Sequence, residues 1–487
     1  MNGSTFRWTS RTGVALLLGL LVTRGASARE VAPDSRSEGG RIRELEARVR
    51  ALESRAATAP ATPPVTAGRN NGLFFLRSSD GAFTLFPTAR MQIDAYAYSP
   101  AFEAPGQPRA SVFLRRVRPE LLGSLFHERV DFMLAGDFAA PANGQATTDA
   151  FVIFNVHDWL HVQVGQFDLP FTMENRTSDR VIDFMERSFT VRNLGTSTKE
   201  PGLMLWGGPR SRLFYYSVGL FNGDGINVRN LDNSFDVVGR IFVRPFAAGA
   251  AALSRVQVGA SGSFGSHRDT NQPIGAAPGW LSLESGYPLF RNTYTGADGN
   301  GTAIAVVPQG DVARVAAEVN VPIGPVAFRA EGIWLKGDVA ETFFASGLPL
   351  RGVGSLRALG GYAQLAFWPI GTSRVLSDPG VGSMPRFVAG AQTPPDGFNL
   401  QLVARAEYDR VDYQSGAPLG ANQQGPSQVA GAYTYWSAGF SANLWWTRHV
   451  RLTLNYVANH IEGATANLPS PGQNFIHEFG ARVGLSL

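Results

Sequence analysis

The sequence predicts an all-β protein: a transmembrane antiparallel β-barrel of about 16 strands, preceded by a short N-terminal coiled-coil helix. Three observations predict this fold. The chain begins with an export signal. Apolar and polar residues then alternate in segments of about ten residues. Finally, the connections between these segments are short and long in turn, as in barrels of the outer membrane.

Residues 1–28 have the features of a secretory signal peptide. Arg7 and Arg11 form a basic front, an apolar run follows from Val14 to Val22, and residues 26–28 read Ala-Ser-Ala, a cleavage site. The apolar run is much shorter than the ~20 residues that a membrane-spanning helix requires. We therefore expect the protein to be exported and this segment to be removed.

Residues 29–58 are predicted to contain the coiled-coil segment. Ile42, Leu45, Val49 and Leu52 follow one another at spacings of three, four and three residues, which is about two heptads of an apolar seam. A helix of this length is marginal by itself, so the seam implies an oligomer. A solvated amphipathic helix is the alternative. Residues 59–72, rich in Pro and Ala, are expected to be a linker.

Residues 73–487 are expected to form the barrel. Near the end of the chain, Val450, Leu452 and Leu454 fall on one face of a segment whose other face carries Arg451 and Thr453. Closure into a barrel would pair every backbone group inside the bilayer. Sixteen such segments are expected to start near Thr84, Phe113, Val130, Ala150, Leu160, Gly202, Phe214, Val237, Val256, Val312, Val326, Gly360, Leu400, Tyr433, Val450 and Glu478.

A soluble β-sandwich or jelly roll would share this alternation. Aromatic residues at the ends of the apolar faces favour the barrel, because such residues form girdles at the two membrane interfaces. The tryptophans expected there are Trp206, Trp334, Trp368, Trp436 and Trp446. One connection breaks the pattern: residues 369–399 lie on the side of the short turns, so they are either an insertion or an additional hairpin.

Composition excludes several other classes. The chain has no cysteine, and its formal charge of +4 falls to about +1 once Arg7, Arg11 and Arg24 are removed, which argues against nucleic-acid binding. The seven histidines show no metal-ligand spacing, and no nucleophile motif such as G-x-S-x-G is present. We therefore expect neither cofactor, metal nor catalytic residues, and an outer-membrane hydrolase has little support.

The segment at about residues 170–199 is predicted to be an inward constriction loop. It follows the alternating strand that starts at Leu160 and interrupts it at Pro170. Its residues are too polar for a core strand and too apolar for a solvent loop, so apolar side chains would anchor it to the inner wall while charges face water. The charged candidates for the constriction are Glu174, Arg176, Asp179, Arg180, Asp183, Glu186, Arg187 and Arg192.

The polar faces of the strands would line the pore, because a basic residue facing lipid at the midplane costs roughly 2–4 kcal/mol. Guanidinium groups stay ionised and bind phosphate or carboxylate oxygens through a fork of donors. The alternative is that they pair with neighbouring carboxylates and only stabilise the wall. The expected pore-lining arginines are Arg90, Arg116, Arg118, Arg129, Arg240, Arg329, Arg405, Arg451 and Arg482.

Four stretches of the chain resemble the phosphate-selective porin O and P family. They are residues 164–171 (VGQFDLPF), 184–188 (FMERS), 360–367 (GGYAQLAF) and 402–408 (LVARAEY). The resemblance implies a trimeric sixteen-stranded barrel whose third loop narrows the pore, with a long segment after the twelfth strand. The chain departs from the family in two respects. Lys199 and Lys336 are its only lysines, where phosphate-selective members also place lysines along the anion path, and it ends in Leu487, where an aromatic residue is usual.

From these observations we expect a porin in the outer membrane of a Gram-negative bacterium. It would be a homotrimer in outer-membrane lipid, with passive diffusion of small hydrophilic solutes, anions above all, and with phosphate or polyphosphate as candidate solutes. The mixture of acids and arginines in the loop favours a weak preference for anions. The alternative is a structural barrel that tethers the membrane to another envelope layer through its N-terminal helix.

Overall fold

The computed structural model divides the chain into two units, residues 1–62 and 63–487, which are described separately. The expected signal peptide lies outside the described residues. So does most of the predicted connection 369–399. The structure describes residues 38–58, 65–70, 73–99, 110–139, 147–196, 198–209, 211, 213–249, 253–268, 283, 293–295, 303–343, 349–373, 397–420, 427, 429–463 and 472–487.

The first unit contains helix α1 (Glu38–Thr58). Its apolar residues Ile42, Leu45 and Val49 are at least half exposed in the single chain. The helix agrees with the sequence pattern, and its assembly into a coiled coil stays a prediction. Among the described residues, no helix has the length and apolar character needed to cross a bilayer.

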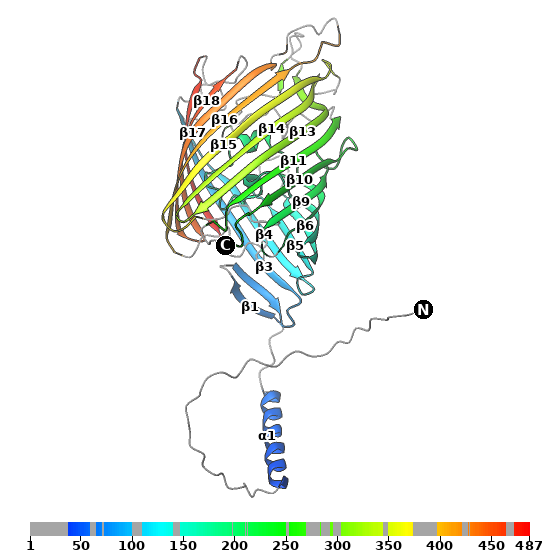
Figure 1. Ribbon diagram of the computed structural model, residues 1–487, viewed down its shortest axis with the longest axis vertical. Coiled ribbons are helices and arrows are strands. Elements are labelled where there is room, and N and C mark those ends of the chain that lie inside the picture. The colour runs from blue at the N-terminus through cyan, green and yellow to red at the C-terminus, as the bar shows by residue number, and fades with distance from the viewer. Residues whose placement is uncertain are drawn as a thin grey trace, which may run out of the picture. The chain divides into compact units, whose positions relative to one another are not determined.

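The second unit is a closed antiparallel barrel, as predicted (Figure 1). Each wall strand pairs with the next in sequence, and the last strand pairs with the first. Every expected strand start lies inside the corresponding strand or, for Val256, one residue before it. The sixteen wall strands are β3 (Thr84–Ser99), β4 (Ala110–Leu125), β5 (Val130–Gly136), β6 (Thr147–His157), β7 (Leu160–Asp168), β8 (Lys199–Gly207), β9 (Phe214–Phe221), β10 (Asp236–Val243), β11 (Gln257–Arg268), β13 (Ala303–Ile323), β14 (Val326–Phe343), β15 (Gly354–Ile370), β16 (Asn399–Gln414), β17 (Gly431–Thr447), β18 (Val450–Glu462) and β19 (Phe475–Ser486).

The seam of the barrel joins the two ends of this unit. Arg482 on β19 donates to both carboxylate oxygens of Asp94 on β3, at 2.6 and 2.7 Å. The backbone N–H of Leu487, the last residue, bonds to the carbonyl of Ala89 at 2.9 Å. Side-chain and main-chain bonds therefore both close the wall.

The outer face of the wall is apolar, and the expected aromatic girdle needs one correction. Trp334, Trp436 and Trp446 are exposed on the outer face, but Trp206 and Trp368 are only 3% exposed and face the interior. The reason is the two-residue period of a strand, which turns a tryptophan inward whenever its sequence neighbours point outward. An aromatic residue near the end of a strand does not by itself show whether its ring faces lipid or the interior.

Part of the expected linker 59–72 is a β-hairpin. Strand β1 (Val65–Asn70) pairs with β2 (Leu73–Ser78), and β2 continues briefly along β3. The hairpin extends beyond the wall at one end of the barrel in Figure 1. A Cβ at Gly68 would lie 2.7 Å from the ring of Phe75, so glycine permits the two strands to pack here. The linker prediction rested on Pro60, Pro63 and Pro64, which all precede β1, and it does not hold for Val65–Asn70.

The remaining strand, β12 (Thr293–Thr295), pairs with an extension of β13. Strands β15 and β16 pair directly with each other along their lengths. No further strand therefore lies between these two in the wall.

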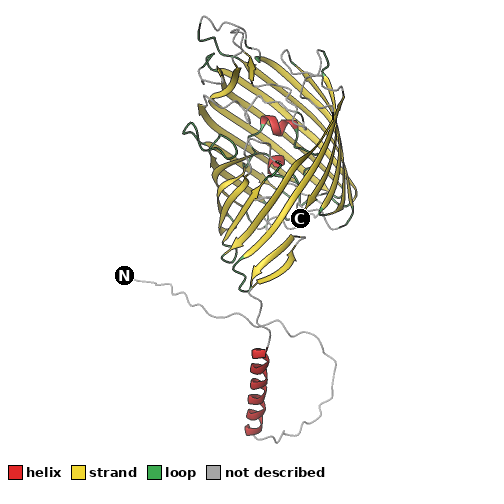
Figure 2. Ribbon diagram, turned by 180° about the vertical axis from the view of Figure 1, so that it is seen from behind, coloured by secondary structure: helices red, strands yellow, loops and turns green. Residues whose placement is uncertain are grey.

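The segment after β7 lies inside the barrel, and its role as a constriction of the pore stays a prediction. It contains two short helices, α2 (Met173–Arg176) and α3 (Phe189–Leu194), and both lie inside the wall in Figure 2. Glycines on the wall make room for the loop. A Cβ at Gly439 would lie 2.9 Å from the ring of Phe184, and one at Gly480 would lie 2.7 Å from Sδ of Met185.

Candidate anion site in the barrel interior

Helix α2 begins against a carboxylate of the wall. Thr172 caps the helix with its side-chain oxygen, which accepts the N–H of Asn175. Glu331 on β14 accepts the N–H groups of Met173 and Glu174 at 2.7 and 2.8 Å. These N–H groups have no partner within the helix, and a negative charge is favoured at this end. The pairing fixes the start of the loop on β14.

Helix α3 is held in the same way. Ser188 caps it by accepting the N–H of Val191 at 3.1 Å, and Glu407 on β16 accepts the N–H of Phe189 at 2.6 Å. The Phe189 ring stacks on Tyr435 with centroids 3.6 Å apart. Both ends of the loop are therefore anchored by wall carboxylates on backbone donors.

The centre of the loop is bound to the opposite wall through Asp183. Its carboxylate accepts from Gln364 and Gln401, each at 2.6 Å, and pairs with the guanidinium of Arg329. Its backbone carbonyl accepts from Ser441 and Asn443. Five wall residues thus bind the carboxylate and the carbonyl of one loop residue.

Apolar packing supports the same part of the loop. Phe184 packs with Ala327, Ala366, Val403 and Val457, which are small or branched residues of the inner wall. The guanidinium of Arg405 lies over the Phe184 ring, 3.9 Å from its centroid, an arrangement that adds attraction between cation and ring. This confirms that apolar loop residues anchor against the wall.

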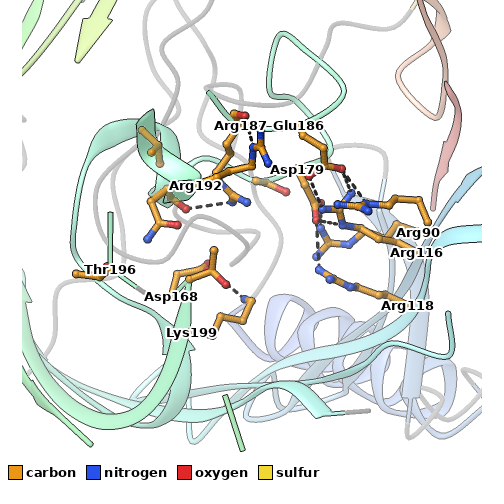
Figure 3. A pocket seen from close by; sticks show the side chains of 15 residues that line it. Arg90, Arg116, Arg118, Asp168, Asp179, Glu186, Arg187, Arg192, Thr196 and Lys199 are labelled. Atoms are coloured by element: carbon orange, nitrogen blue, oxygen red, sulfur yellow. Dashed lines mark hydrogen bonds and ion pairs between the residues drawn. The ribbon is translucent and has the colours of Figure 1, made fainter. Parts of the chain in front are cut away.

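A cavity of about 330 Å³ lies between the loop and strands β3 and β4. Figure 3 shows charged side chains converging on it from the wall and from the loop. Seven cationic side chains and three carboxylates line it. The lining residues are Arg90, Arg115, Arg116, Arg118, Asp168, Asn175, Ser178, Asp179, Glu186, Arg187, Val191, Arg192, Thr196, Thr198 and Lys199.

On the wall side, arginines converge on two loop carboxylates, Asp179 and Glu186. Asp179 pairs with Arg116 at 2.8 Å, with Arg118 at 3.2 Å and with Arg90. Glu186 has three such partners as well: Arg115 at 3.0 Å, Arg116 at 2.9 Å and Arg482 at 2.7 Å. Three of these arginines have further acidic partners: Arg90 pairs with Glu120, Arg118 with Asp137 and Arg482 with Asp94. The ion pairs on the wall side are therefore close to balanced in charge.

On the loop side, Arg187 is held by carbonyl groups. Its Nε donates to the carbonyl of Glu174 at 3.0 Å, and its Nη2 donates to those of Asn175 and Thr177 at 3.1 and 3.0 Å. Among the described residues, no carboxylate lies within ion-pair distance of this guanidinium. Arg187 therefore has a fixed orientation and a full positive charge at the cavity.

The loop carboxylates, which lie outside the spanning strands, stay ionised. Burial opposes the charge of Asp179, but Arg90, Arg116 and Arg118 outweigh it and hold its pKa well below the ordinary value. Burial also opposes the charge of Glu186, whose pKa the surrounding arginines likewise lower well below the ordinary range. Both groups keep their negative charge at neutral pH.

The structure brings together only part of the predicted site. Of the expected constriction residues, Asp179, Glu186, Arg187 and Arg192 line the cavity, and Arg90, Arg116 and Arg118 do so among the expected wall arginines. Glu174, Arg176, Arg180 and Asp183 bind other parts of the loop or the wall instead. The wall arginines Arg240, Arg329, Arg405, Arg451 and Arg482 pair with carboxylates or hold loop carbonyls, as the cross-pairing alternative expected.

Arg129 is a correction. It lies exposed in the turn between β4 and β5, outside the wall, and does not line the interior. The alternation placed it on the polar face, but the residues just before it have a positive φ and already form the turn. A strand pattern that is extended by a single residue across a turn gives this error.

Sequence reasoning also missed several lining residues, of which Arg115 is the most informative. Strict alternation sends only one of Arg115 and Arg116 inward. The register shifts between Gln92 and Ile93, where the facing strand β4 carries an extra residue, and both arginines contact Glu186. A β-bulge of this kind leaves no signal in the alternation. The described residues contain no group of three or more His, Asp or Glu arranged for a metal.

The model of the family described as phosphate-selective porin O and P matches residues 87–472. No curated protein matches the chain. Among solved structures, a loop L8 deletion mutant of OmpT, an outer membrane protein of Vibrio cholerae, is similar at 9% identity and a TM-score of 0.49, over 83% of this chain and 100% of that one. The outer membrane channel DcaP of Acinetobacter baumannii is similar at 10% identity and a TM-score of 0.47, over 84% and 99%.

Proposed function

We propose that this chain, which belongs to the phosphate-selective porin O and P family, lets small hydrophilic solutes diffuse passively across the membrane, with a preference for anions. It is an outer-membrane β-barrel of a Gram-negative bacterium, and its family and fold point to a channel rather than an enzyme. The observation that carries the anion preference is Arg187 in the cavity beside the constriction loop, because carbonyl groups hold its guanidinium and no carboxylate among the described residues lies within ion-pair distance.

Arg187 is the residue that we expect to attract a solute most directly. Its three carbonyl partners fix the guanidinium without neutralising it. A fixed cation in a narrow, partly desolvated passage interacts more strongly with an anion than it would in bulk water. The fork of N–H donors suits phosphate and carboxylate oxygens. Arg187 would thus favour anions where the loop borders the cavity.

The carboxylates in the same cavity weaken this preference for anions. Asp179 and Glu186 hold the wall arginines in place and offset part of their charge. A volume of about 330 Å³ lies at the lower end of the ~300–1,000 Å³ found for small-molecule sites. We therefore propose inorganic anions and small organic acids as solutes, with phosphate or polyphosphate among the candidates and with weak rather than strict selectivity.

We also propose that the protein is a homotrimer. Helix α1 exposes the apolar residues Ile42, Leu45 and Val49 along one seam, and such a seam is stable when it packs against copies of itself. Cross-linking of the protein in outer-membrane vesicles tests the stoichiometry. Recovery of monomers alone would contradict it.

Reversal potentials across a planar bilayer with a salt gradient test the channel and its preference together. The wild type is expected to give stepwise conductance and a potential on the anion side. Arg187→Glu should move the potential toward cations, and Arg229→Glu, an exposed position outside the cavity, should leave it unchanged. Without conductance the protein is not a porin. A cation-selective wild type, or an unchanged potential in Arg187→Glu, would contradict the anion site alone.

The exposed seam of α1 supports a second candidate function, the tethering of the outer membrane to another envelope layer. Deleting residues 29–62 removes α1 and leaves the hairpin of β1 and β2 in place. If conductance survives the deletion while the membrane detaches from the underlying layer, tethering is a function of the helix. If attachment is unchanged, the helix serves assembly only.

A further inference from the structure

Three cations lie together on the outer face of the barrel, the face opposite to the pore. They are Lys336 on β14, Arg357 on β15 and Arg410 on β16, and all three are exposed. We call them the outer cationic patch. They are unexpected, because basic residues on the lipid-facing side of a barrel are unfavourable toward the midplane and tolerated only near an interface.

The strand register places the three close to one another. Lys336 is directly opposite Arg357 on the neighbouring strand, and Arg357 is opposite Asp412, which follows Arg410 by two residues. Side chains directly opposite have Cβ atoms about 4.5–5.5 Å apart, and diagonal neighbours about 7–8 Å. One group about the size of a phosphate is therefore within reach of more than one cation.

The patch borders the apolar band of the outer face. Trp334, Leu359 and Tyr408 each precede or follow a patch residue by two positions on the same strand and face outward, with exposures of 44%, 60% and 51%. Toward the other end of β14, the outward residues back to Val326 are all apolar or glycine. The patch therefore lies just beyond the surface that meets acyl chains, at the level of lipid headgroups.

This edge belongs to the end of the barrel with the longer loops. Strands β14 and β15 are joined there by residues 344–353, whereas β13 and β14 are joined at the other end by a two-residue turn. In outer-membrane barrels the longer loops are extracellular. The lipids that reach the patch are consequently those of the outer leaflet.

The protein itself supplies no partner for these charges. None of the three patch residues makes a hydrogen bond or an ion pair with any other residue that the structure describes. Two cations directly opposite each other destabilise a sheet, so the pair of Lys336 and Arg357 calls for a bridging anion.

Acidic residues on the same face do not remove this requirement. Asp338 and Asp412 each lie two residues beyond a patch cation, on the side away from the apolar band. Asp338 accepts the N–H of Asp311, and Glu462 is 3.6 Å from His460. Asp412 lies directly opposite Arg357 but forms no ion pair with it, whereas the residues opposite Lys336 are Arg357 and Ala313 and include no acid.

We propose that the outer cationic patch binds the phosphorylated headgroup of an outer-leaflet lipid, whose acyl chains lie against the apolar band below it. Phosphate oxygens match the fork of Arg357 and Arg410 and the point charge of Lys336. Basic residues at a membrane surface attract anionic headgroups with roughly additive strength. A free phosphate would use the cations only, whereas a phosphorylated lipid uses the cations and the adjoining apolar surface.

Binding of fluorescent lipid A, a phosphorylated glycolipid, to the whole protein in nanodiscs of uncharged lipid tests the proposal. The wild type should bind lipid A more tightly than the same lipid without its phosphates. The variant Lys336→Gln, Arg357→Gln, Arg410→Gln should lose affinity on the order of 100-fold. The control variant Arg43→Gln, Arg129→Gln, Arg229→Gln removes three exposed arginines elsewhere and should bind as the wild type does.

Three results would overturn the proposal: equal affinity for the lipid without phosphates, unchanged affinity in the patch variant, or full displacement of lipid A by millimolar inorganic phosphate, which would indicate a site for a free anion. Mobility of unheated samples in gels shows that each barrel is folded. If the triple variant does not fold, Arg357→Gln alone must weaken binding and Arg357→Lys must restore part of it. Reversal potentials should not change in any patch variant, so this test is independent of the pore.

Discussion

Asp179 and Asp183 are two carboxylates on one loop, four residues apart, yet they lie in different environments. Asp183 is enclosed by one arginine, two glutamines and two further wall residues that bind its carbonyl. Asp179 meets three arginines and faces the cavity. The difference separates two uses of charge inside one barrel: closed pairing fixes the loop, and charge beside a cavity can act on a solute.

The two regions also differ in how the wall approaches the loop. Around Phe184 and Met185 the wall carries Gly439 and Gly480, which bring the backbone into contact with loop side chains. Around Asp179 the wall carries long arginine side chains on β3 and β4, which hold the loop at a distance and leave a cavity. Glycines on the wall therefore let the loop pack closely against it, and long arginine side chains leave the cavity open.

The largest effect is expected from Asp183→Ala. It leaves the Arg329 guanidinium, which is 1% exposed, without its carboxylate. The loss of one partner of a buried ion pair costs about 3–5 kcal/mol. Urea unfolding in detergent measures this loss, with Asp311→Ala, an exposed acid on β13, as the control. Equal stability of the two variants would show that Asp183 does not fix the loop.

Gly480→Leu should have the next largest effect. The added side chain must displace Met185, and overpacking of this kind costs about 1–3 kcal/mol. The displaced loop should also change the single-channel conductance. Gly81→Leu, in an exposed turn where a Cβ meets nothing within 4 Å but φ is positive, separates backbone strain from packing. If both variants leave conductance unchanged, the loop does not set the width of the passage.

Asp179 and Asp183 should differ most clearly in their effects on ion selectivity. Asp179→Asn removes a negative charge from the cavity and should raise the anion-to-cation permeability ratio about fivefold, which corresponds to about 1 kcal/mol. Asp183→Asn keeps the size of the side chain, lies outside the cavity and should leave the ratio unchanged. Reversal potentials in a salt gradient give both values, and equal shifts would contradict the assignment of the cavity as the selective region.

The smallest effect is expected from pH. The pKa values of Asp179 and Glu186 are lowered well below the ordinary range, so their ion pairs are fully formed above the unfolded-state pKa of about 4. Stability from these pairs is lost only as pH falls through the lower folded-state pKa. Reversal potentials should therefore agree between pH 7 and pH 5. A shift toward anions inside that window would show that the pKa of one of these carboxylates is raised above its ordinary value, not lowered.

The barrel was predictable from the sequence because lipid and water impose a period of two on every wall strand. In β18, apolar Val450, Leu452 and Leu454 alternate with polar Arg451 and Thr453. In any membrane structure other than a barrel, this alternation would expose charge to lipid. The inward loop was predictable for a related reason, because its mixture of charges and large apolar residues suits neither face of a strand. Both predictions rest on whether side chains face lipid, water or protein. The residue types within one segment of the chain already indicate this.

The site was only partly predictable, because it depends on which side chains meet across the barrel. Nothing local in the sequence distinguishes Asp179 from Asp183, and their partners lie on β3 and β4 in one case and on β14 to β17 in the other. The bulge that turns Arg115 inward has no sequence signature either. The register of strands far apart in the sequence, rather than residue type, determines which side chains line the cavity.

The seam between β3 and β19 has a consequence for biogenesis. The ion pair of Asp94 with Arg482 joins residues 388 positions apart, so the contact that completes the wall cannot form before β19 has been synthesised. Until β19 is present, the sheet keeps two open edges, and a bilayer offers no partner for their backbone groups. Insertion and closure must therefore be completed together, and the C-terminal strand acts as the step that commits the whole chain to the membrane.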